Sequence, residues 1–437
     1  MENIIVVEGG HPIEGELILQ GSKNAALPML AATLLNAGVT TLNNCPDISD
    51  VNDMIELLRS LGCKTVRNEK TVIIDASNVD GYEIDKEQAV RTRGSFLMLG
   101  ALLGRTGKAK IPYPGGCPIG CRPVDIHLKA LNALGMEMLD EDAEADEAVS
   151  AVLHRGQILN NKNRAILKRV IRLSYPSVGA TQNVILASVL GSGEVVVKNC
   201  AREPEIVELC NMLLAMGAHI EGIGTSKLYI KSVSELDDVE WNVPGDRIAA
   251  GTYMAAAIIT DGRLTVRGIN AGHIQDEIRY FTEAGAAITL WDDALCIRRS
   301  HRKGKILPVK KLVTSPYPGF PTDMQSQFMS MLLYAEGKSK IKETVFENRF
   351  MTVPEFNKMG ASISISRNGK TAYIDGVSRL YGSDMRAQDL RGGASLVLAA
   401  LGAIGKSRIS GYEHIARGYE RFDENLNMLG ADVKIQV

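Results

Sequence analysis

The sequence predicts an α/β protein of two domains, each built from three repeated units with helices inside and sheets outside. The chain has 437 residues, more than one hydrophobic core usually organises. A segment ending in an apolar residue and Gly recurs six times, about 70 residues apart. Within each recurrence, a fully apolar stretch precedes an amphipathic one. These observations favour six βαβαββ-like units, three per domain.

The recurring glycine is suited to the position that ends a helix, where a left-handed backbone is needed. The six pairs are Leu61-Gly62, Leu134-Gly135, Met216-Gly217, Ala284-Gly285, Met359-Gly360 and Leu429-Gly430.

Each unit begins with a stretch rich in Ala, Leu and Met that is apolar on nearly every side, which predicts a helix buried in a core. The six stretches are Ala25–Leu35, Ser95–Leu103, Ala180–Leu190, Ala249–Ile259, Ser326–Tyr334 and Ala394–Ile404.

Short β-like runs follow most of these helices, and amphipathic helices come next. The runs are Val39–Leu42, Glu194–Lys198, Arg263–Arg267, Lys338–Ile341 and Ser407–Ile409. Asp50–Arg59 and Glu205–Leu214 are clear amphipathic helices. Paired strands close most units, as in 65–66 with 72–75 and 362–364 with 372–374.

The repeats divide the chain into an N-terminal domain, 22–244, and a C-terminal domain made of 1–21 and 245–437. Met1–Gln20 precede the first unit, so we expect them to cross over and complete a sheet of the C-terminal domain. Trp241–Gly245 then form the second crossing.

The composition excludes several classes of function. A net charge of −2 and 5% aromatic residues do not fit a nucleic-acid binder. Seven scattered cysteines form no disulfide framework and favour a reducing cytoplasm. The sequence lacks the spacing of Cys and His residues that is typical of zinc sites, so it predicts no metal site. The N-terminus does not resemble a signal peptide, and no apolar run is long enough to span a membrane.

The second repeat is irregular. An acidic run, 140–147, is followed by basic residues between Lys162 and Arg172. Runs of charge usually form solvated faces, so we interpret this stretch as a surface excursion.

The loop Pro114–Asp125 carries Cys117 five residues before Arg122, among three glycines and two further prolines. Glycine and proline residues shape a loop that can approach a ligand closely. A neighbouring guanidinium favours the thiolate of a reachable cysteine. On its own this pattern is equally typical of a structural turn.

The starts of the buried helices are polar or charged. Helix N-termini carry unpaired N–H groups and a partial positive charge. Basic residues recur at or near these starts, namely Lys23, Arg93 and Arg391, with Arg122 and Arg417 on loops. We therefore expect an anion-binding cleft between the domains, although each residue alone could simply cap a helix.

Six ordered stretches resemble the UDP-N-acetylglucosamine 1-carboxyvinyltransferase family of enolpyruvyl transferases. They are Gly21–Pro28, Pro114–Asp125, Ala201–Val207, Phe320–Gln325, Thr344–Met351 and Arg417–Arg421. The resemblance runs from end to end and implies a two-domain inverse α/β barrel with the active site between the domains. It also implies enolpyruvyl transfer from phosphoenolpyruvate to the 3-hydroxyl of UDP-N-acetylglucosamine, with no cofactor or metal. We separately expect a monomer or weak homo-oligomer.

The resemblance assigns three catalytic residues, Cys117, Asp323 and Lys23. Cys117 would protonate phosphoenolpyruvate and react with fosfomycin-type epoxides, while Asp323 would be the base or orienting group for the sugar hydroxyl. Lys23 and Asn24 would contact phosphoenolpyruvate, Arg122 and Arg417 its phosphate, and Arg391 its carboxylate. The remaining substrate-binding residues implied are Arg93, Pro123, Val124, Asp125, Ile126, Tyr175, Ser177, Val178, Gly179, Val345, Arg349 and Asp389.

Two alternatives stay open at this point. A related enzyme, 3-phosphoshikimate carboxyvinyltransferase, shares the fold but lacks the Cys loop. The other alternative is a regulatory paralogue that binds the UDP-sugar with little turnover. It stays open because Tyr175 and Ala416 stand where many relatives have Lys and Asp. Cys121 and the stretch Glu141–Ile171 also depart from the family pattern.

Overall fold

The computed structural model describes residues 3–114, 119–120, 124–139, 148–153, 168–300 and 304–436. It divides into two compact units. Unit 1 comprises the described residues of 1–22, 117–122 and 245–437, and unit 2 those of 23–116 and 123–244. Ile119 and Gly120 thus group with unit 1, whereas the sequence placed their whole loop in the domain 22–244. The reason is contact with another loop of unit 1, in which Asn348 N donates to the Ile119 carbonyl at 3.0 Å.

Unit 2 contains three described sheets, ordered β13-β3-β5-β4, β6-β8-β7 and β11-β12-β10-β9. Its helices are α1 (Lys23–Ala32), η1 (Thr33–Leu35), α2 (Ser49–Ser60), α3 (Lys86–Ala89), η2 (Arg93–Leu97), α4 (Met98–Thr106), α5 (Asp125–Leu134), α6 (Val178–Ser188) and α7 (Pro204–Ala215). Its strands are β3 (Val39–Asn43), β4 (Lys64–Asn68), β5 (Thr71–Asp75), β6 (Lys108–Pro112), β7 (Met136–Met138), β8 (Ala148–Leu153), β9 (Lys168–Arg172), β10 (Glu194–Lys198), β11 (His219–Glu221), β12 (Lys227–Lys231) and β13 (Val239–Asn242).

Unit 1 also contains three described sheets, ordered β21-β22-β1-β23, β15-β16-β14-β2 and β17-β18-β20-β19. Its helices are α8 (Arg247–Ile259), η3 (Ala271–Ile274), α9 (Gln275–Glu283), η4 (Thr322–Met324), α10 (Gln325–Leu332), α11 (Val353–Lys358), α12 (Leu390–Leu401), α13 (Tyr412–Ala416) and α14 (Phe422–Met428). Its strands are β1 (Ile4–Glu8), β2 (Glu14–Ile18), β14 (Arg263–Arg267), β15 (Ala286–Leu290), β16 (Ala294–Arg299), β17 (Leu312–Val313), β18 (Lys338–Lys342), β19 (Ser362–Ile365), β20 (Thr371–Asp375), β21 (Asp384–Arg386), β22 (Lys406–Ser410) and β23 (Asp432–Gln436).

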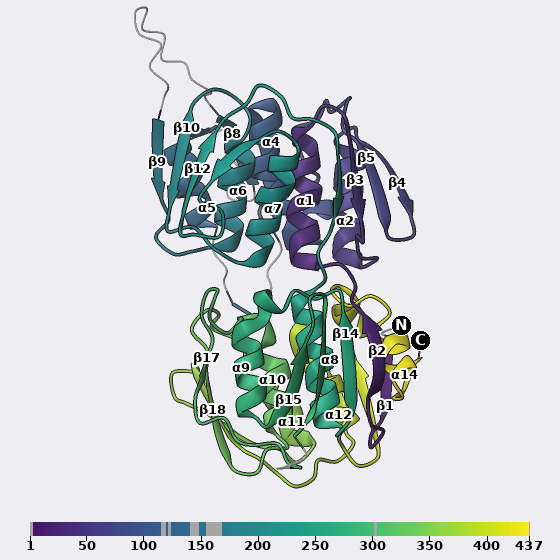
Figure 1. Ribbon diagram of the computed structural model, residues 1–437. Helices are drawn as coiled ribbons and strands as arrows, with labels where there is room; N and C mark the ends of the chain where they lie inside the picture. Colours follow the sequence, from purple (N-terminus) through teal and green to yellow (C-terminus); the bar gives the residue numbers. More distant parts are fainter. Residues whose placement is uncertain are drawn as a thin grey trace, which may run out of the picture. The chain divides into compact units, whose positions relative to one another are not determined.

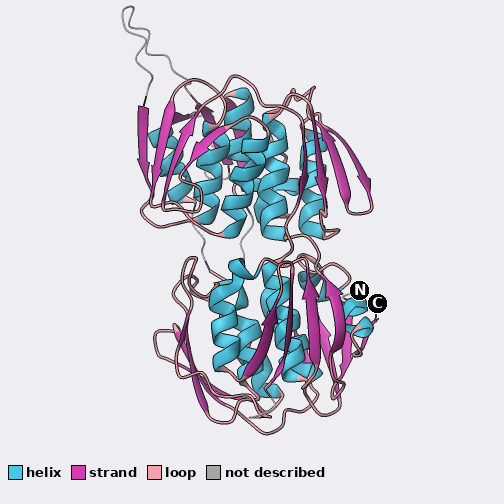
Figure 2. Cartoon of the chain, viewed as in Figure 1, coloured by secondary structure: helices cyan, strands magenta, loops and turns pink. Residues whose placement is uncertain are grey.

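The predicted helices-inside arrangement is confirmed in each unit. Every residue of α8 and α10 is buried, and α12 is buried from Arg391 onward. In unit 2, α4 packs against α6 at a close approach between Gly100 and Asn183, where the Gly100 N–H donates to Asn183 Oδ1 at 2.7 Å. Figure 2 shows the helices at the centre of each unit and the strands around them. Helices apolar on all sides are stable only in such surroundings.

The six recurring glycines end helices as predicted. All have a positive φ, between 92° for Gly360 and 106° for Gly135. A side chain at such an angle would be strained, which explains why glycine recurs at this position of each unit.

The N-terminal residues join two sheets of unit 1, where the sequence predicted one. β1 lies between β22 and β23 and is antiparallel to both, while β2 pairs in parallel with β14. Figure 1 shows these purple strands among the green and yellow elements of the same unit. The short link from Gly9 to Ile13 turns the chain from the first sheet to the second.

The irregular second repeat differs in part from its interpretation as a surface excursion. Residues 140–147 and 154–167 lie outside the described residues. Lys168–Arg172, however, form β9, which pairs in parallel with β10. Ile171 is buried within β9 while Lys168 and Arg172 are exposed, so the charged residues mark the outward face of an edge strand.

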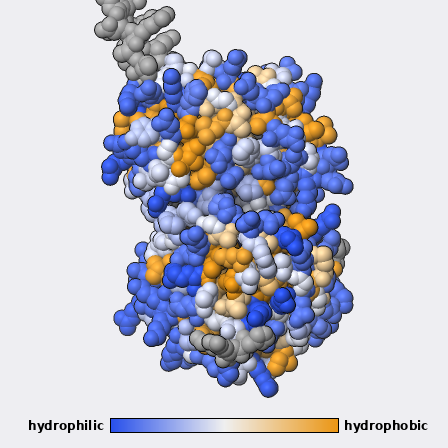
Figure 3. Space-filling model, viewed as in Figure 1, coloured by the Kyte–Doolittle hydropathy of each residue, from blue (hydrophilic) through white to orange (hydrophobic). Residues whose placement is uncertain are grey.

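Figure 3 shows a viewed face on which hydrophilic residues surround scattered hydrophobic patches. Among the described residues, no helix has both the length and the apolar character needed to span a membrane.

Candidate functional site

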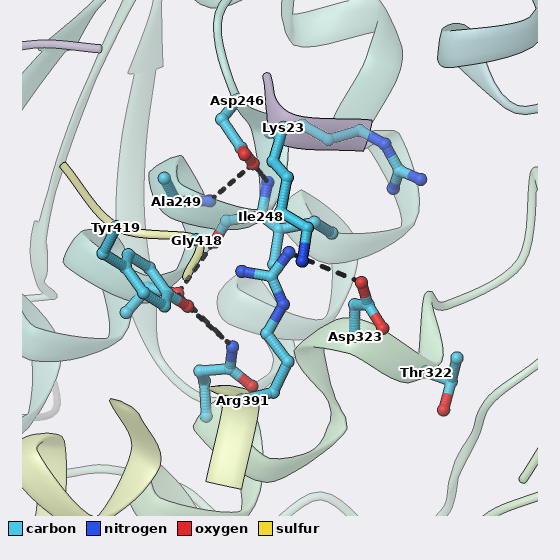
Figure 4. A network of polar contacts seen from close by, with 12 residues as sticks. Lys23, Asp246, Ile248, Ala249, Thr322, Asp323, Arg391, Gly418 and Tyr419 are labelled. Atoms are coloured by element: carbon cyan, nitrogen blue, oxygen red, sulfur yellow. Dashed lines mark hydrogen bonds and ion pairs between the residues drawn. The ribbon is translucent and has the colours of Figure 1, made fainter. Parts of the chain in front are cut away.

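Asp323 lies between two guanidinium groups in unit 1. It is the second residue of η4, which leads into the buried helix α10, and its side chain is 26% exposed. Arg349 Nη2 donates to Asp323 Oδ1 at 2.5 Å, and Arg391 Nη2 donates to Oδ2 at 3.4 Å. Figure 4 shows Asp323 and Arg391 directed toward each other. Each carboxylate oxygen therefore accepts a charge-assisted hydrogen bond from an arginine, and the two bonds fix the orientation of the carboxylate.

The start of α12 fixes Arg391. Asp389 caps this helix, and its Oδ1 accepts from the N–H groups of Arg391 and Gly392, both at 3.0 Å. The same oxygen lies 3.8 Å from Arg349 Nη1. Two carboxylates and two guanidiniums from three segments of chain thus form one cluster, which we call the Asp323 cluster (Asp323, Arg349, Asp389 and Arg391).

Arg391 keeps hydrogen-bonding capacity that the described protein atoms do not use. The residue is 3% exposed, and its Nε and Nη1 are buried without a hydrogen-bond partner among the described atoms. Buried donors of this kind are rare and need an explanation such as a ligand. Burial acts to lower the pKa of Arg391, but Tyr419, Asp323 and Asp246 outweigh it and raise that pKa. The group remains a cation and is suited to an anionic ligand.

A hydrogen-bonded group of buried residues supports Arg391 from one side. The guanidinium carbon lies 5.4 Å from the centre of the Tyr419 ring. The Tyr419 hydroxyl bonds to Thr252 Oγ1 at 2.9 Å and accepts from Gln327 Nε2 at 3.2 Å. The labelled network in Figure 4 includes Tyr419, together with Asp246, which caps α8 through the N–H groups of Ile248 and Ala249. These contacts restrict where the guanidinium can lie.

Val345 and Arg417 also belong to unit 1. The Val345 N–H donates to Glu343 Oε1 at 2.7 Å, just beyond the end of β18. Arg417 ends α13, and the next residue, Gly418, packs so tightly on Leu390 that a Cβ would lie 2.7 Å from Cδ2. Arg417 therefore lies close in the fold to the start of α12.

In unit 2, Lys23 begins α1 and forms an ion pair with Asp50. The two side-chain atoms, Lys23 Nζ and Asp50 Oδ2, are 2.5 Å apart. Asp50 is 2% exposed and lies in the first turn of α2. An almost buried carboxylate holds the ammonium at the helix start, next in sequence to Asn24.

Arg93 begins η2, which Thr92 caps by accepting from the Gly94 N–H at 3.2 Å. Gly94 packs between Met54 and Leu27, since a Cβ there would lie 3.1 Å from one and 3.3 Å from the other. The start of η2 is thereby placed beside α1 and α2.

The starts of α5 and α6 lie together. Gly179 packs against His127, whose Cε1 would be 2.8 Å from a Cβ at that position. His127 Nδ1 is 2.8 Å from Asn183 Nδ2 on α6. These contacts bring the predicted residues on α5 next to those on α6.

The predicted residues on these two helix starts have ordinary local roles. Val124 precedes α5, which begins with Asp125 and Ile126. A hydrogen bond from Lys129 lowers the pKa of Asp125. Ser177 caps α6 through the Ala180 N–H at 3.3 Å, ahead of Val178 and Gly179. The side chain of Tyr175 is 39% exposed, and its carbonyl accepts from the Ser177 N–H at 2.7 Å.

Cys117, Arg122 and Pro123 lie outside the described residues. The structure brings together Asp323, Arg349, Asp389 and Arg391 in unit 1, and the α5 and α6 starts in unit 2. Sequence reasoning missed Asp50, Tyr419 and Glu343. Asp50 was visible only as the first residue of an amphipathic helix, and Tyr419 only as a neighbour of Arg417. Within the described ranges, no group of three or more His, Cys, Asp or Glu residues could hold a metal ion.

Comparison with known proteins agrees with this architecture. The family model described as EPSP synthase (3-phosphoshikimate 1-carboxyvinyltransferase) matches residues 7–426. UDP-N-acetylglucosamine 1-carboxyvinyltransferase 2 of Carboxydothermus hydrogenoformans is 43% identical over 432 residues, covering 98% of both chains. UDP-N-acetylglucosamine 1-carboxyvinyltransferase of Cellvibrio japonicus is 42% identical over 430 residues, again covering 98% of both.

Two solved structures share the fold. The enolpyruvyl transferase NikO from Streptomyces tendae has a TM-score of 0.86 at 23% identity, covering 100% of this chain and 99% of that one. EPSP synthase from Acinetobacter baumannii has a TM-score of 0.74 at 16% identity, covering 100% of both chains. The predicted fold class is confirmed. With the identities above, the chain belongs to the EPSP synthase family of enolpyruvyl transferases, in the group of the UDP-N-acetylglucosamine 1-carboxyvinyltransferases.

Proposed function

We propose that the protein transfers the enolpyruvyl group of phosphoenolpyruvate to the 3-hydroxyl of UDP-N-acetylglucosamine and releases phosphate. The observation that carries this proposal is Arg391, a buried cation with two donors unused by described protein atoms, next to the carboxylate of Asp323. An anion and a reacting hydroxyl are what these two groups would bind. The relatives' names give UDP-N-acetylglucosamine and a carboxyvinyl group as the transferred group.

Phosphoenolpyruvate carries both a phosphate and a carboxylate, so several cations are needed to bind it and to stabilise charge during the reaction. We assign its carboxylate to Arg391 and its phosphate to Arg122 and Arg417. Lys23, held by Asp50, and Asn24 complete the contacts.

The UDP-sugar is assigned to the remaining predicted residues, which share positions at helix starts or turns. These are Arg93, Arg122, Pro123, Val124, Asp125, Ile126, Tyr175, Ser177, Val178, Gly179, Asp323, Val345, Arg349 and Asp389. Helix N-termini are suited to the diphosphate because their N–H groups are unpaired.

The reaction then follows as addition and elimination. The thiol of Cys117 donates a proton to the methylene carbon of phosphoenolpyruvate, which makes C2 electrophilic. The sugar 3-hydroxyl gives its proton to Asp323 and its oxygen bonds to C2, forming a tetrahedral ketal. Loss of a proton from the new methyl group and departure of phosphate restore the double bond. This scheme needs no metal or organic cofactor.

The product would enter peptidoglycan precursor synthesis, and so cell growth, shape and division. We place the protein in the cytoplasm because its cysteines fit no disulfide framework. Of the described cysteines, Cys63, Cys200, Cys210 and Cys296 are free, and these four are buried, as is Cys45. We propose a monomer or a weak homo-oligomer.

A substrate comparison tests the proposal. Phosphate release from phosphoenolpyruvate should require UDP-N-acetylglucosamine and should not occur with shikimate 3-phosphate. The description of the matching family model makes shikimate 3-phosphate the relevant competitor. Release with shikimate 3-phosphate alone would reverse the assignment. Tight binding of the UDP-sugar without any release would favour the regulatory role that Tyr175 and Ala416 leave open.

Replacing Cys117 by Ser should lower kcat about 100-fold and abolish covalent labelling by an epoxide of the fosfomycin type, since Ser is a much weaker acid and nucleophile. Intact-mass measurement after incubation with the epoxide detects the label. Cys121→Ser is the matched control in the same loop and should still be labelled. A label that persists in Cys117→Ser would assign the acid role to another residue.

A further inference from the structure

Glu343 is a buried carboxylate that accepts three hydrogen bonds beside the Asp323 cluster. It directly follows β18 and is 2% exposed, and its own N–H donates to the Lys370 carbonyl at 3.0 Å. Oε1 accepts from the N–H groups of Val345 at 2.7 Å and Phe346 at 3.1 Å. Oε2 accepts from the Thr322 hydroxyl at 3.0 Å. A single side chain therefore holds both the turn containing Val345 and the residue before Asp323.

The direction of these hydrogen bonds is fixed by chemistry. A carboxylate oxygen accepts, and the Thr322 hydroxyl is the donor to Glu343 Oε2. The oxygen of that hydroxyl is then an acceptor for Arg349 Nε, which lies 3.2 Å away. Arg349 Nη2 donates to Asp323 Oδ1. The result is a continuous chain of oriented bonds from Glu343 through Thr322 and Arg349 to Asp323.

We propose that Glu343 is a positioning residue for enolpyruvyl transfer. By orienting the Thr322 hydroxyl it sets the guanidinium of Arg349, and through it the carboxylate of Asp323. Its second oxygen independently fixes the Val345 turn. The inference rests on the proposed function, since it concerns the group assigned to the sugar hydroxyl.

The change Glu343→Gln keeps the size and shape of the side chain but replaces one acceptor oxygen with an NH2 donor. The amide oxygen can still accept from Val345 and Phe346, but the amide nitrogen must then face Thr322. The threonine oxygen would meet two donors, from Gln and from Arg349, and its own proton would lose its acceptor. The fold should survive while the orientation of Asp323 is disturbed. A small misplacement of a catalytic group can lower the rate by about 100-fold.

The test measures kcat and KM by phosphate release for wild type, Glu343→Gln, Thr322→Val and the double variant. Each single change should lower kcat about 10- to 100-fold and raise KM for the UDP-sugar by a smaller factor, because the orientation of Asp323 is disturbed while the bonds to Val345 remain. The double variant should be no slower than the worse single one, since both changes break the same chain of bonds. Thr322→Ser, which keeps the hydroxyl, should restore most of the rate.

Glu355→Gln is the matched control. Glu355 is a buried carboxylate of the same unit, 7% exposed, that accepts from Lys358 and from the Arg386 N–H. Its replacement should change the melting temperature and leave kcat within twofold. The proposal would be overturned if the double variant lost kcat by the product of the two single losses. It would also be overturned if Glu343→Gln kept the kcat of the wild type. A wild-type protein that releases no phosphate would instead reject the proposed function, and the two failures are therefore distinguishable.

Discussion

Replacing Asp323 by Asn is expected to lower kcat for enolpyruvyl transfer by about 1000-fold, which lies in the range for loss of a general base. The amide cannot take the proton of the sugar hydroxyl. Its NH2 group also replaces one of the two acceptor oxygens and so faces the donor of either Arg349 or Arg391, which lie 2.5 and 3.4 Å from the carboxylate oxygens. Phosphate release at saturating concentrations of both substrates measures the effect, and circular dichroism checks that the variant is folded.

The matched control is Asp276→Asn. Asp276 also pairs with an arginine of unit 1, since Arg279 Nη2 donates to it at 2.6 Å, but the Arg279 side chain is 56% exposed. Exposed pairs of this kind contribute little, so kcat should not change. If Asp323→Asn kept kcat within threefold of wild type, Asp323 could be neither the base nor the orienting group.

Replacing Arg391 by Gln is expected to raise KM for phosphoenolpyruvate about 100-fold. Two charge-assisted hydrogen bonds to a carboxylate contribute about 3 kcal/mol together, which corresponds to that factor. Arg391→Lys should raise KM for phosphoenolpyruvate about tenfold, because lysine keeps the charge but lacks the planar guanidinium with its paired donors. KM for the UDP-sugar should change much less in both variants. Initial rates at varied phosphoenolpyruvate, with the UDP-sugar saturating, give the comparison.

Arg299→Gln provides the contrast for Arg391. The guanidinium of Arg299 donates from Nε to the Ile258 carbonyl at 2.7 Å and from Nη2 to the Ile259 carbonyl at 2.8 Å. Its donors therefore bind the end of α8, and its loss should lower stability without changing KM. An equal rise of KM in both variants would mean that Arg391 acts on the fold and not on the ligand.

Most of the fold could be predicted because the same pattern of apolar and amphipathic segments recurs six times in the sequence. The stretch Ala249–Ile259 is apolar on every side and lies within α8, and the runs Glu194–Lys198 and Arg263–Arg267 coincide with β10 and β14. Periodicity is a local property, so it locates such elements well. It gives no information on which sheet a strand joins. The N-terminal residues were therefore predicted to complete one sheet, whereas β1 and β2 join two different sheets.

The Asp323 cluster could be predicted from a family resemblance, but not from the spacing of its members. Arg349 and Arg391 lie 26 and 68 positions from Asp323 in sequence. The Lys23–Asp50 pair likewise depends on the packing of α1 against α2. Glu343 was missed for another reason. A glutamate after a strand of alternating lysines looks like one more surface charge, and only its burial shows otherwise.

The place of β1 and β2 has a consequence for the order in which the chain can mature on the ribosome. Their partners are β14, β22 and β23, the last of which ends at Gln436. β2 can pair once β14 has been synthesised, but β1 must remain without its neighbours until β22 and β23 have emerged. Unit 2, by contrast, takes its described residues from 23–116 and 123–244, all of them synthesised before residue 245, and can assemble early. Contacts of such long sequence separation slow folding, so completion of unit 1 should be the late, rate-limiting event.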